Sequence, residues 1–428
     1  MTRKNSRVSI EILGSGREVG RAAISINYNG RKLLLDYGVN FDENDNPIFP
    51  GHIRPRDIEA LVLTHSHLDH IGAAPSLYVS VFPRLIATPV TLDVSKLLLY
   101  DMIKLNGPFL PYDNATVDDM LGHAETRGYG EKITAGDFEV TLLYNGHIPG
   151  SAAVYVNIDS NTILYTSDFN TVTTKLMEPA RLGGYKVNTL IIESTYGSSN
   201  HPPREETEKL FYDSVEEVVK KGGTVLVPSF SVSRGQEIMC ILAERGFSYP
   251  VWIDGMIRQI TEIYLAHGEY LRDPSILSKA ANQFRMVKGW QDRRKAYKKP
   301  GVIIASAGML KGGPSLYYLK KLAGDPKNAV FLVSYQAEGT PGRRIIEEGV
   351  YGDADIPVKA RVQWFDFSSH TDQNGIMQTI KGLRGLERII LVHGDPMIQE
   401  ELANKIKEEY DGNIEVLIPS NGENIQLR

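Results

Sequence analysis

A run of six residues, His65-Ser66-His67-Leu68-Asp69-His70, contains four side chains of the kinds that bind metal ions. The preceding segment, residues 58–64, is apolar and β-branched, so it is predicted to be a buried strand that ends where the run begins. On an extended segment His65 and His67 point to one side, whereas Asp69 and His70 can turn toward a second metal ion. Imidazole with carboxylate suits zinc or a similar first-row metal. A strand-end loop also leaves a coordination position for water, as a catalytic site requires.

Three further side chains of these kinds, His147, Asp168 and His393, each follow a segment with a strand pattern. A single histidine is more often an ordinary core or surface residue, so one such position alone would carry little weight. Repeated placement of a ligand just after a strand is how a rigid sheet presents a site on its edge loops. The seven residues together predict a hydrolase with two metal ions.

The composition is typical of a globular enzyme with two domains, because 428 residues exceed what one core usually holds. The sequence has no apolar run long enough to span a bilayer and no signal-peptide core, so we expect no membrane association and a cytoplasmic location. The single cysteine, Cys240, lies in an apolar helical segment and is predicted to be a core residue. The net charge of −5 argues against binding nucleic acid over the whole surface, so any nucleic-acid substrate must meet a local basic patch.

The first part of the sequence has the pattern of a β-rich domain. Residues 22–27 and 32–36 flank Asn29-Gly30, a strong hairpin signal, and Asp36 ends the second of these strands. Further strands are predicted at residues 85–87, 138–144, 152–158 and 162–166, with helices at 68–79 and 91–105.

From about Tyr196 strands and helices alternate, which indicates a second domain of the α/β class. After Pro357 a strand, a helix and a strand that ends at His393 repeat the strand-then-histidine pattern, so the chain is predicted to return to the first domain. The expected division is residues 1–197 and 358–428 for the first domain and 198–357 for the inserted domain. Parallel strands are predicted at 224–227, 251–253, 302–305 and 330–334, helices at 204–221, 234–244 and 259–270, and the returning elements at 358–364, 372–383 and 388–393.

Two later motifs complete a family pattern: Glu193 in Ile-Ile-Glu-Ser-Thr-Tyr-Gly, and His370 in Ser368-Ser-His-Thr-Asp372. With the residues above, they resemble the metallo-β-lactamase superfamily and specifically its β-CASP branch of nucleic-acid-processing nucleases. The resemblance covers essentially the whole chain and implies an αββα sandwich with an inserted α/β β-CASP domain. Within that branch the chain resembles archaeal homologues of the cleavage and polyadenylation specificity factor nuclease, and ribonuclease J. We expect the KH modules of the former and the extra C-terminal domain of the latter to be absent, so that RNA placement relies on the catalytic core.

The resemblance also implies a role for each site residue. Asp168 would bridge two zinc ions per chain, and the pair would suit in-line attack of water on phosphorus. His370 would be the general acid that protonates the leaving oxygen, with Glu193 fixing its tautomer and raising its pKa. Asp36 would support the metal-binding loop from outside the ligand set. The catalytic set is therefore Asp36, Asp69, Asp168, Glu193 and His370, with His65, His67 and His147 on one metal and Asp69, His70 and His393 on the other.

Other segments could contact RNA or could be mistaken for a binding site. Residues 288–299 mix six basic residues with Trp290 and Tyr297, but such a run is more often a solvated helix face. The loop of residues 14–20 has the spacing G-x-G-x-x-x-G before a hairpin, so it is predicted to be a turn beside the active site rather than a dinucleotide site. Hydroxyl- and glycine-rich turns before helices can hold phosphate, and the candidates are Ser231, Ser233, Arg234, Ser334, Gln336 and Gly339.

The leading hypothesis is a zinc-dependent ribonuclease that degrades single-stranded RNA from 5′ to 3′ and prefers a 5′-monophosphate. An endoribonuclease acting in RNA 3′-end processing or termination would use the same chemistry. A non-catalytic scaffold subunit is the alternative of another class, but such proteins lose metal ligands that this chain keeps. A small-molecule hydrolase would not need Glu193, His370 or the inserted domain. A homodimer and a complex for RNA processing or degradation both remain open as assemblies.

Overall fold

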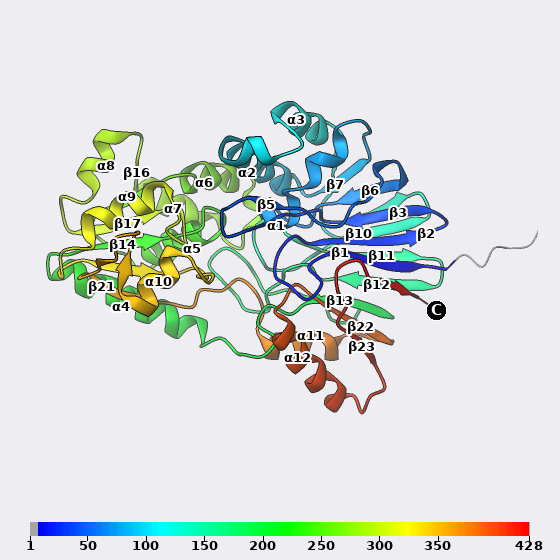
Figure 1. Cartoon of the computed structure of the whole chain (residues 1–428). Coiled ribbons are helices and arrows are strands. Elements are labelled where there is room, and N and C mark those ends of the chain that lie inside the picture. The colour runs from blue at the N-terminus through cyan, green and yellow to red at the C-terminus, as the bar shows by residue number, and fades with distance from the viewer. Residues whose placement is uncertain (1–6, 428) are drawn as a thin grey trace, which may run out of the picture. The chain divides into compact units, whose positions relative to one another are not determined.

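The structure is a computed structural model that describes residues 7–427 (Figure 1). The chain forms two compact units. The first comprises Met1–Val172, Pro179–Asn200 and His370–Arg428, and the second comprises Thr173–Glu178 and His201–Ser369. The second unit is therefore an insertion, and the chain returns to the first unit at His370 rather than at residue 358.

Two seven-stranded sheets form the centre of the first unit, as the resemblance implied. The first sheet has the strand order β24-β1-β2-β3-β6-β7-β8, and the second has the order β23-β22-β13-β12-β11-β10-β9. The strands of the first sheet are β1 Ser9–Gly14, β2 Ala23–Tyr28, β3 Arg31–Leu35, β6 Ile58–Val62, β7 Arg84–Ala87, β8 Ala124–Thr126 and β24 Asn424–Gln426. Those of the second are β9 Lys132–Ala135, β10 Phe138–Tyr144, β11 Ala152–Ile158, β12 Asn161–Tyr165, β13 Thr189–Glu193, β22 Arg388–Val392 and β23 Glu415–Leu417.

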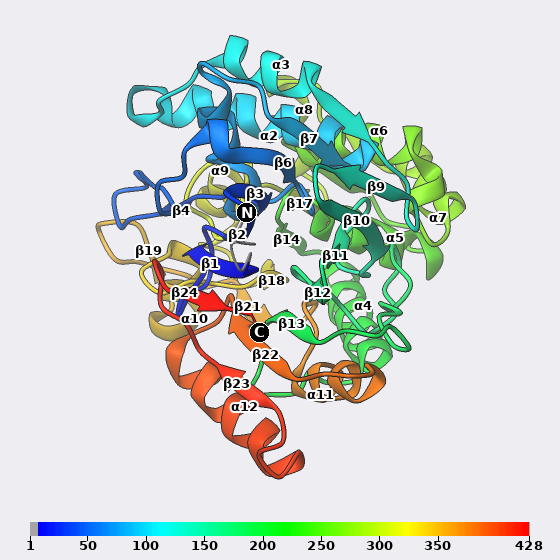
Figure 2. The same ribbon diagram turned by 90° about the vertical axis from the view of Figure 1, so that its right-hand side faces the viewer.

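Each sheet buries both faces, which gives four layers. The inner faces meet in one core, where Ile24 and Val62 of the first sheet pack with Val154 and Ile390 of the second. Helices α2 (Pro89–Asn106) and α3 (Asn114–Gly122) cover the outer face of the first sheet, and α11 (Gln373–Gly382) and α12 (Pro396–Glu409) cover that of the second (Figure 2). The arrangement is the αββα sandwich, in which apolar faces are removed from water on both sides of each sheet.

The strands, helices and hairpin predicted in this unit are observed, with one exception. Asn29 and Gly30 both have positive φ, 51° and 79°, and join β2 to β3 in the predicted hairpin. The helix predicted over residues 68–79 is wrong in length, because α1 covers only Leu68–Ile71 and a 3₁₀ helix follows at Ala74–Tyr78. Pro75 explains the break, since it has no N–H to donate to Ile71 and its ring would clash with that carbonyl.

A six-stranded parallel sheet with the order β16-β15-β17-β14-β18-β21 forms the second unit, which confirms an α/β insertion. Its strands are β14 Thr224–Pro228, β15 Val251–Asp254, β16 Arg285–Met286, β17 Gly301–Ala305, β18 Ala329–Leu332 and β21 Arg361–Trp364. Its helices are α4 Arg204–Lys220, α5 Arg234–Glu244, α6 Ile257–Ala266, α7 Pro274–Gln283, α8 Trp290–Ala296, α9 Gly313–Leu322 and α10 Pro341–Glu348.

Two boundaries in this unit differ from the sequence pattern. Strand β21 pairs with β18, so the strand predicted at residues 358–364 belongs to the inserted sheet. Helix α6 ends at Ala266, and the 3₁₀ turn Gly268–Tyr270 replaces the last part of the helix predicted at residues 259–270. Cys240 is fully buried in α5, as predicted for a core residue.

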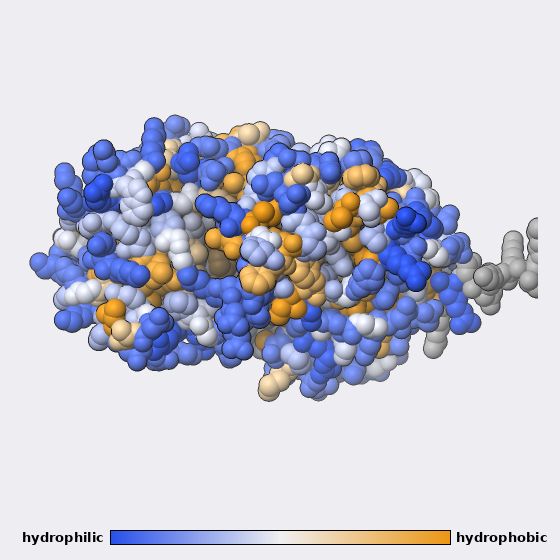
Figure 3. All heavy atoms as spheres, turned by 45° about the horizontal axis from the view of Figure 1, so that its top comes forward, coloured by the Kyte–Doolittle hydropathy of each residue, from blue (hydrophilic) through white to orange (hydrophobic). Residues whose placement is uncertain are grey.

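Short elements complete the fold: β4 Asn40–Phe41, β5 Pro47–Ile48, β19 Val350–Tyr351, β20 Ile356–Pro357, and 3₁₀ helices at Pro55–Asp57 and Gly107–Phe109. Among residues 7–427 no helix has the length and apolar character needed to cross a bilayer. Hydrophilic residues cover most of the face drawn in Figure 3, and apolar residues gather there in several smaller groups.

Candidate metal centre

The predicted metal-binding residues all follow strands of the two sheets in the first unit. His65 comes after β6, His147 after β10, Asp168 after β12 and His393 directly after β22. Strands β10, β12, β13 and β22 run in the same direction, so their carboxyl ends meet at one edge of the second sheet. The ligands therefore lie on loops that two rigid sheets hold in place.

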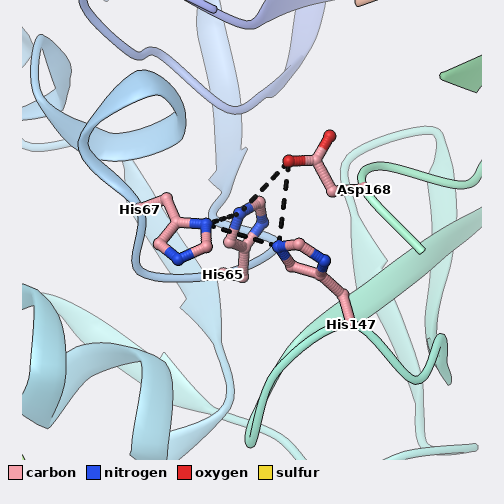
Figure 4. A group of neighbouring side chains, drawn as sticks. All are labelled: His65, His67, His147 and Asp168. Carbon is pink, nitrogen blue, oxygen red and sulfur yellow. Dashed lines mark hydrogen bonds and ion pairs between the residues drawn. The ribbon is translucent and has the colours of Figure 1, made fainter. Parts of the chain in front are cut away.

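Three imidazoles and one carboxylate form the first group (Figure 4). The Nδ1 atom of His67 lies 3.1 Å from Nε2 of His65 and 3.3 Å from Nε2 of His147. The Oδ2 atom of Asp168 lies 3.7 Å from Nε2 of His65 and 3.9 Å from Nε2 of His147. A tetrahedral first-row cation with bonds of about 2.0–2.1 Å would hold its nitrogen ligands roughly 3.3 Å apart, so this spacing fits a cation at the centre.

Asp69, His70 and His393 form the second group, which shares Asp168 with the first. Nε2 of His70 lies 3.2 Å from Oδ2 of Asp168, and Nε2 of His393 lies 3.3 Å from Oδ2 of Asp69. The other carboxylate oxygen of Asp168, Oδ1, is buried and makes no hydrogen bond within residues 7–427. A buried carboxylate oxygen without a donor is costly, and a cation would satisfy it.

The protonation states of the first group also suit a cation. Burial lowers the pKa of His65 well below its ordinary value and lowers the pKa of His67 to about 4, so both imidazoles keep a free lone pair at neutral pH. Burial opposes the charge on Asp168, but His393 and His70 beside it lower its pKa well below the usual range. Neutral imidazoles and an ionised carboxylate are the forms that bind metal.

Asp36 contacts both ends of the loop of residues 64–70, which carries four of the predicted metal ligands, and is itself fully buried. Its carboxylate accepts hydrogen bonds from the backbone N–H and the hydroxyl of Thr64, both at 2.8 Å, and Oδ2 lies 2.8 Å from Nδ1 of His70. Because Asp36 engages Nδ1, the Nε2 atom of His70 faces Asp168. A carboxylate that binds the far nitrogen of a ligand histidine orients the ring and fixes its tautomer.

The backbone is tightly turned at three of these positions. Asp36, Ser167 and His393 have φ of 58°, 52° and 50°, in the left-handed region that side-chain-bearing residues adopt infrequently. Each lies just past the end of a strand, where the sharp turn redirects its side chain. Such conformations persist where surrounding contacts hold them, and they cluster at functional sites.

Glu193 and His370 lie beside the two groups as a hydrogen-bonded pair. Oε2 of Glu193 is 2.8 Å from Nδ1 of His370, and Oε1 accepts from the backbone N–H of Phe169 at 2.8 Å. Burial disfavours the charged imidazole, but the carboxylates of Glu193, Asp168 and Asp69 together outweigh it and raise the pKa of His370 to about 9. Asp168, Glu193 and His370 could also hold a metal ion as a third group, so metal content must be measured wherever His370 is tested.

Sequence reasoning missed three residues that hold this site together. Tyr165 donates to Oδ2 of Asp36 at 3.2 Å, and Thr195 donates to Oε2 of Glu193 at 2.6 Å. Gly38 lies against the metal-binding loop, where any Cβ would overlap the carbonyl oxygen of Asp69. Tyr165 and Thr195 each lie within three residues of a predicted site residue, which is the one signal that could have found them.

The loop of residues 14–20 is a turn beside the site, as predicted. The backbone N–H of His393 donates to the carbonyl of Ser15 at 2.8 Å, and the N–H of Gly394 donates to the carbonyl of Glu18 at 3.0 Å. Strand β2, not a helix, follows the loop. This is incompatible with a dinucleotide-binding turn, which needs a helix start.

The six residues predicted to hold phosphate belong to the second unit. Their two turns follow the adjacent parallel strands β14 and β18, and the backbone N–H of Phe230 lies 3.4 Å from Oγ of Ser334, so the turns lie side by side. The side-chain amide of Gln336 donates to the carbonyls of Gly308 and Ser334, which commits it to holding the loop. Gly339 is exposed with a φ of 71°. Ser231 is half-buried, whereas Ser233, Arg234 and Ser334 are buried.

Three known domain families match successive parts of the chain. Residues 18–229 match the Metallo-beta-lactamase superfamily, and residues 235–345 match the Beta-Casp domain. Residues 355–419 match the Zn-dependent metallo-hydrolase RNA specificity domain.

Archaeal proteins are similar to the chain over nearly its whole length. A protein of Saccharolobus solfataricus named RNase aCSPSF2 is 47% identical over 98% of this chain and 85% of its own. A protein of Methanocaldococcus jannaschii named probable RNase MJ4 is 36% identical over 97% of this chain and 99% of its own. The transcription termination factor FttA of Pyrococcus horikoshii is 37% identical over 99% of this chain and 72% of its own.

A solved structure illustrates that the fold is known. It is the crystal structure of a protein of unknown function from Enterococcus faecalis, with a TM-score of 0.61 and 13% identity, over 98% of this chain and 100% of that one. At this identity the likeness concerns the fold alone.

Proposed function

Because the chain belongs to the β-CASP branch of the metallo-β-lactamase superfamily, a family of metal-dependent ribonucleases, we propose that it hydrolyses single-stranded RNA with two zinc ions. The observation that carries the proposal is the convergence of seven buried or half-buried donors in two groups that share Asp168. Nitrogen-rich ligation with carboxylates favours zinc over magnesium or calcium, which prefer oxygen alone. The names of the similar archaeal proteins support an RNA substrate.

The first group would be held by His65, His67 and His147, and the second by Asp69, His70 and His393, with Asp168 common to both. When bound, the two cations would acidify a water and neutralise charge that develops on the phosphate oxygens. Asp36 would keep His70 in the tautomer whose Nε2 faces the site, through the 2.8 Å contact at Nδ1.

Departure of the ribose oxygen requires a proton, and we assign its donation to His370. Its Nδ1 is held by Glu193, which leaves Nε2 as the nitrogen that can give a proton to a leaving group. The raised pKa keeps this imidazole protonated at neutral pH, which is the form that a general acid needs.

For the polarity of cleavage we propose 5′→3′ exonuclease action with a preference for a 5′-monophosphate. The support is the pair of turns after β14 and β18 in the second unit, where hydroxyls and backbone N–H groups could surround a terminal phosphate. An endonuclease in RNA 3′-end processing or termination is the second candidate, because the similar FttA proteins are named transcription termination factors. A non-catalytic scaffold subunit is disfavoured, because such subunits lose metal ligands and this chain keeps all seven candidate ligands.

Digestion of one single-stranded RNA, labelled separately at the 5′ and the 3′ end, tests the proposal. Release of single labelled nucleotides from the 5′ end, with progressive shortening of the 3′-labelled strand, is the expected pattern. Internal fragments from both labels would replace the exonuclease with the endonuclease. An absence of any cleavage by the zinc-loaded protein would overturn the ribonuclease function itself.

A further inference from the structure

Helices α8 and α9 of the second unit bring three aromatic side chains together on an exposed surface. Trp290 is 60% exposed, although tryptophan is one of the most apolar large side chains. Its ring centroid lies 5.5 Å from that of Tyr317, and the ring of Tyr297 lies 6.3 Å from that of Tyr317. Tyr297 and Tyr317 are half-buried, so Trp290 presents an exposed ring that two further rings support, an arrangement on which a flat ligand can stack.

Positively charged side chains lie beside two of these rings. The guanidinium of Arg293 lies 5.0 Å from the ring of Trp290, and the ammonium of Lys321 lies 5.9 Å from that of Tyr317. We call this group, with its exposed basic neighbours, the Trp290 surface. It consists of Trp290, Tyr297 and Tyr317 with Lys288, Arg293, Arg294, Lys298, Lys299, Lys320 and Lys321.

Most of this charge is not neutralised locally. Arg293 is paired with the buried carboxylate of Asp254 at 2.7 Å and 3.0 Å, so it is committed to the fold. The other basic residues of the Trp290 surface make no ion pair with a described residue. Residues 288–299 hold six basic residues and one acidic residue, Asp292, in a chain whose net charge is −5. A solvated helix face would carry both signs, so the local excess calls for an anionic partner.

We propose that the Trp290 surface binds single-stranded RNA through residues other than those of the metal centre. The proposal rests on the proposed function for the class of nucleic acid. Bases stack on exposed aromatic rings whatever their sequence, and unpaired lysines and arginines follow the phosphate backbone. An acidic protein segment would need the charges but would not need three clustered rings. The sequence alone favoured a solvated helix face for residues 288–299. The structure shows in addition that exposed Trp290 lies against Tyr317 of another helix.

RNA affinity of the full chain, measured in the presence of a chelator so that no strand is cut, tests the surface. We expect Trp290→Ala to weaken binding of a twenty-nucleotide RNA by roughly tenfold, the size of one lost stacking contact. The pair Lys298→Gln with Lys299→Gln should reduce the slope of log affinity against log salt by about 1.4, since two phosphate contacts are lost. The matched control is Lys209→Gln with Lys327→Gln, which removes two exposed lysines elsewhere in the same unit.

Equal affinities and equal salt slopes for the control and the two test variants would overturn the proposal. A change in sedimentation without a change in RNA affinity would also overturn it and would show that the surface contacts protein. A protein that binds RNA through this surface but never cleaves it would contradict the proposed function and leave this inference standing. Circular dichroism checks that Trp290→Ala remains folded.

A second inference rests on a different observation, the position of the Thr195 hydroxyl. Its Oγ1 donates to Oε2 of Glu193 at 2.6 Å, and the same atom lies 3.2 Å from Nδ1 of His393. A hydroxyl has one proton, and the shorter contact to the carboxylate uses it. Thr195 can therefore accept from Nδ1–H of His393, which also lies 3.4 Å from Oδ1 of Asp168, and Nε2 of His393 faces Asp69 at 3.3 Å.

We infer that Thr195 is a positioning residue that joins the proposed general-acid pair to the second metal group. It holds the Glu193 oxygen that contacts His370 and at the same time selects the tautomer of His393 that leaves Nε2 free. This inference also rests on the proposed function. Groups that orient metal ligands in this way commonly change metal affinity by 10–100-fold.

Thr195→Val and Thr195→Ser separate the hydroxyl from the shape, because valine keeps the volume and serine keeps the hydroxyl. We expect Thr195→Val to lower kcat by tenfold or more with little change in KM, and to lower zinc affinity in a chelator competition. Thr195→Ser should restore most of both. Equal losses in the two variants would assign Thr195 a packing role, and undiminished kcat and zinc affinity in Thr195→Val would remove it from the site. Zinc affinity is measured without RNA, so failure of the proposed function does not affect that result.

Discussion

His370 and Glu193 lie 2.8 Å apart between Nδ1 and Oε2, and only His370 is open to solvent, with 21% of its side chain exposed against 1% for Glu193. The exposed member can reach a ligand, whereas the buried member can act only through its partner. The imidazole of His370 therefore faces solvent, and the carboxylate of Glu193 lies behind it. We expect substitutions at the two residues to have different effects on activity.

His67→Ala and Asp168→Ala should each abolish RNA cleavage while the fold persists. Both residues are proposed to hold metal from loops at the sheet edge rather than to fill a core, and Asp168 belongs to both candidate groups. Bound zinc, RNA cleavage and circular dichroism should be measured on the same preparation. Full cleavage by either variant would contradict the two-metal assignment.

His370→Ala should lower turnover by roughly a hundredfold to ten-thousandfold, which is the usual contribution of a positioned general acid. Metal content should stay near that of the unchanged protein, because the residue is assigned no metal. Loss of one metal ion per chain in this variant would show that His370 is a ligand of the third group instead.

Glu193→Gln should move the alkaline limit of activity to lower pH. The general acid acts when protonated, so activity is lost as the pH rises through the pKa of His370. Burial works against the imidazolium, and Glu193, with Asp168 and Asp69, raises that pKa to about 9 in spite of it. Without the carboxylate the pKa falls, and the loss begins at a lower pH. A pH profile of kcat in both proteins makes the comparison, and coincident alkaline limbs would remove Glu193 from this role.

A strand with a 5′-monophosphate should be degraded much faster than its triphosphorylated twin. The two turns that hold Ser231 and Ser334 could give a terminal phosphate dianion charge-assisted hydrogen bonds from hydroxyl and backbone donors. A triphosphate is bulkier, and we expect it to fit less well between the two turns. Initial rates on the two RNAs and on one with a 5′-hydroxyl provide the measurement. Rates that do not depend on the 5′ end would favour the endonuclease.

The run from His65 to His70 could be predicted because its chemistry is local. Four ligand side chains within six positions, directly after an apolar strand, already specify the kind of site whatever surrounds them. The same logic found His147, Asp168 and His393, since each follows a strand that its own β-branched residues predict. Periodicity likewise indicated a β-rich first part followed by alternating strands and helices, because burial on one or both faces leaves a trace in the order of residues, whereas the two-sheet sandwich was implied by the family resemblance.

Only the tertiary structure determined which other residues contact the site residues at these strand ends. The hydroxyl of Thr195 and the phenol of Tyr165 act on Glu193 and Asp36 through contacts that no spacing in the sequence encodes. Gly38 matters because the peptide of Asp69, from another strand end, packs against it. Strand β21 joins the inserted sheet because β18 offers it an edge, although its sequence suits either unit. Residue order determines the groups that the chain can offer, whereas packing between distant segments determines which of them meet.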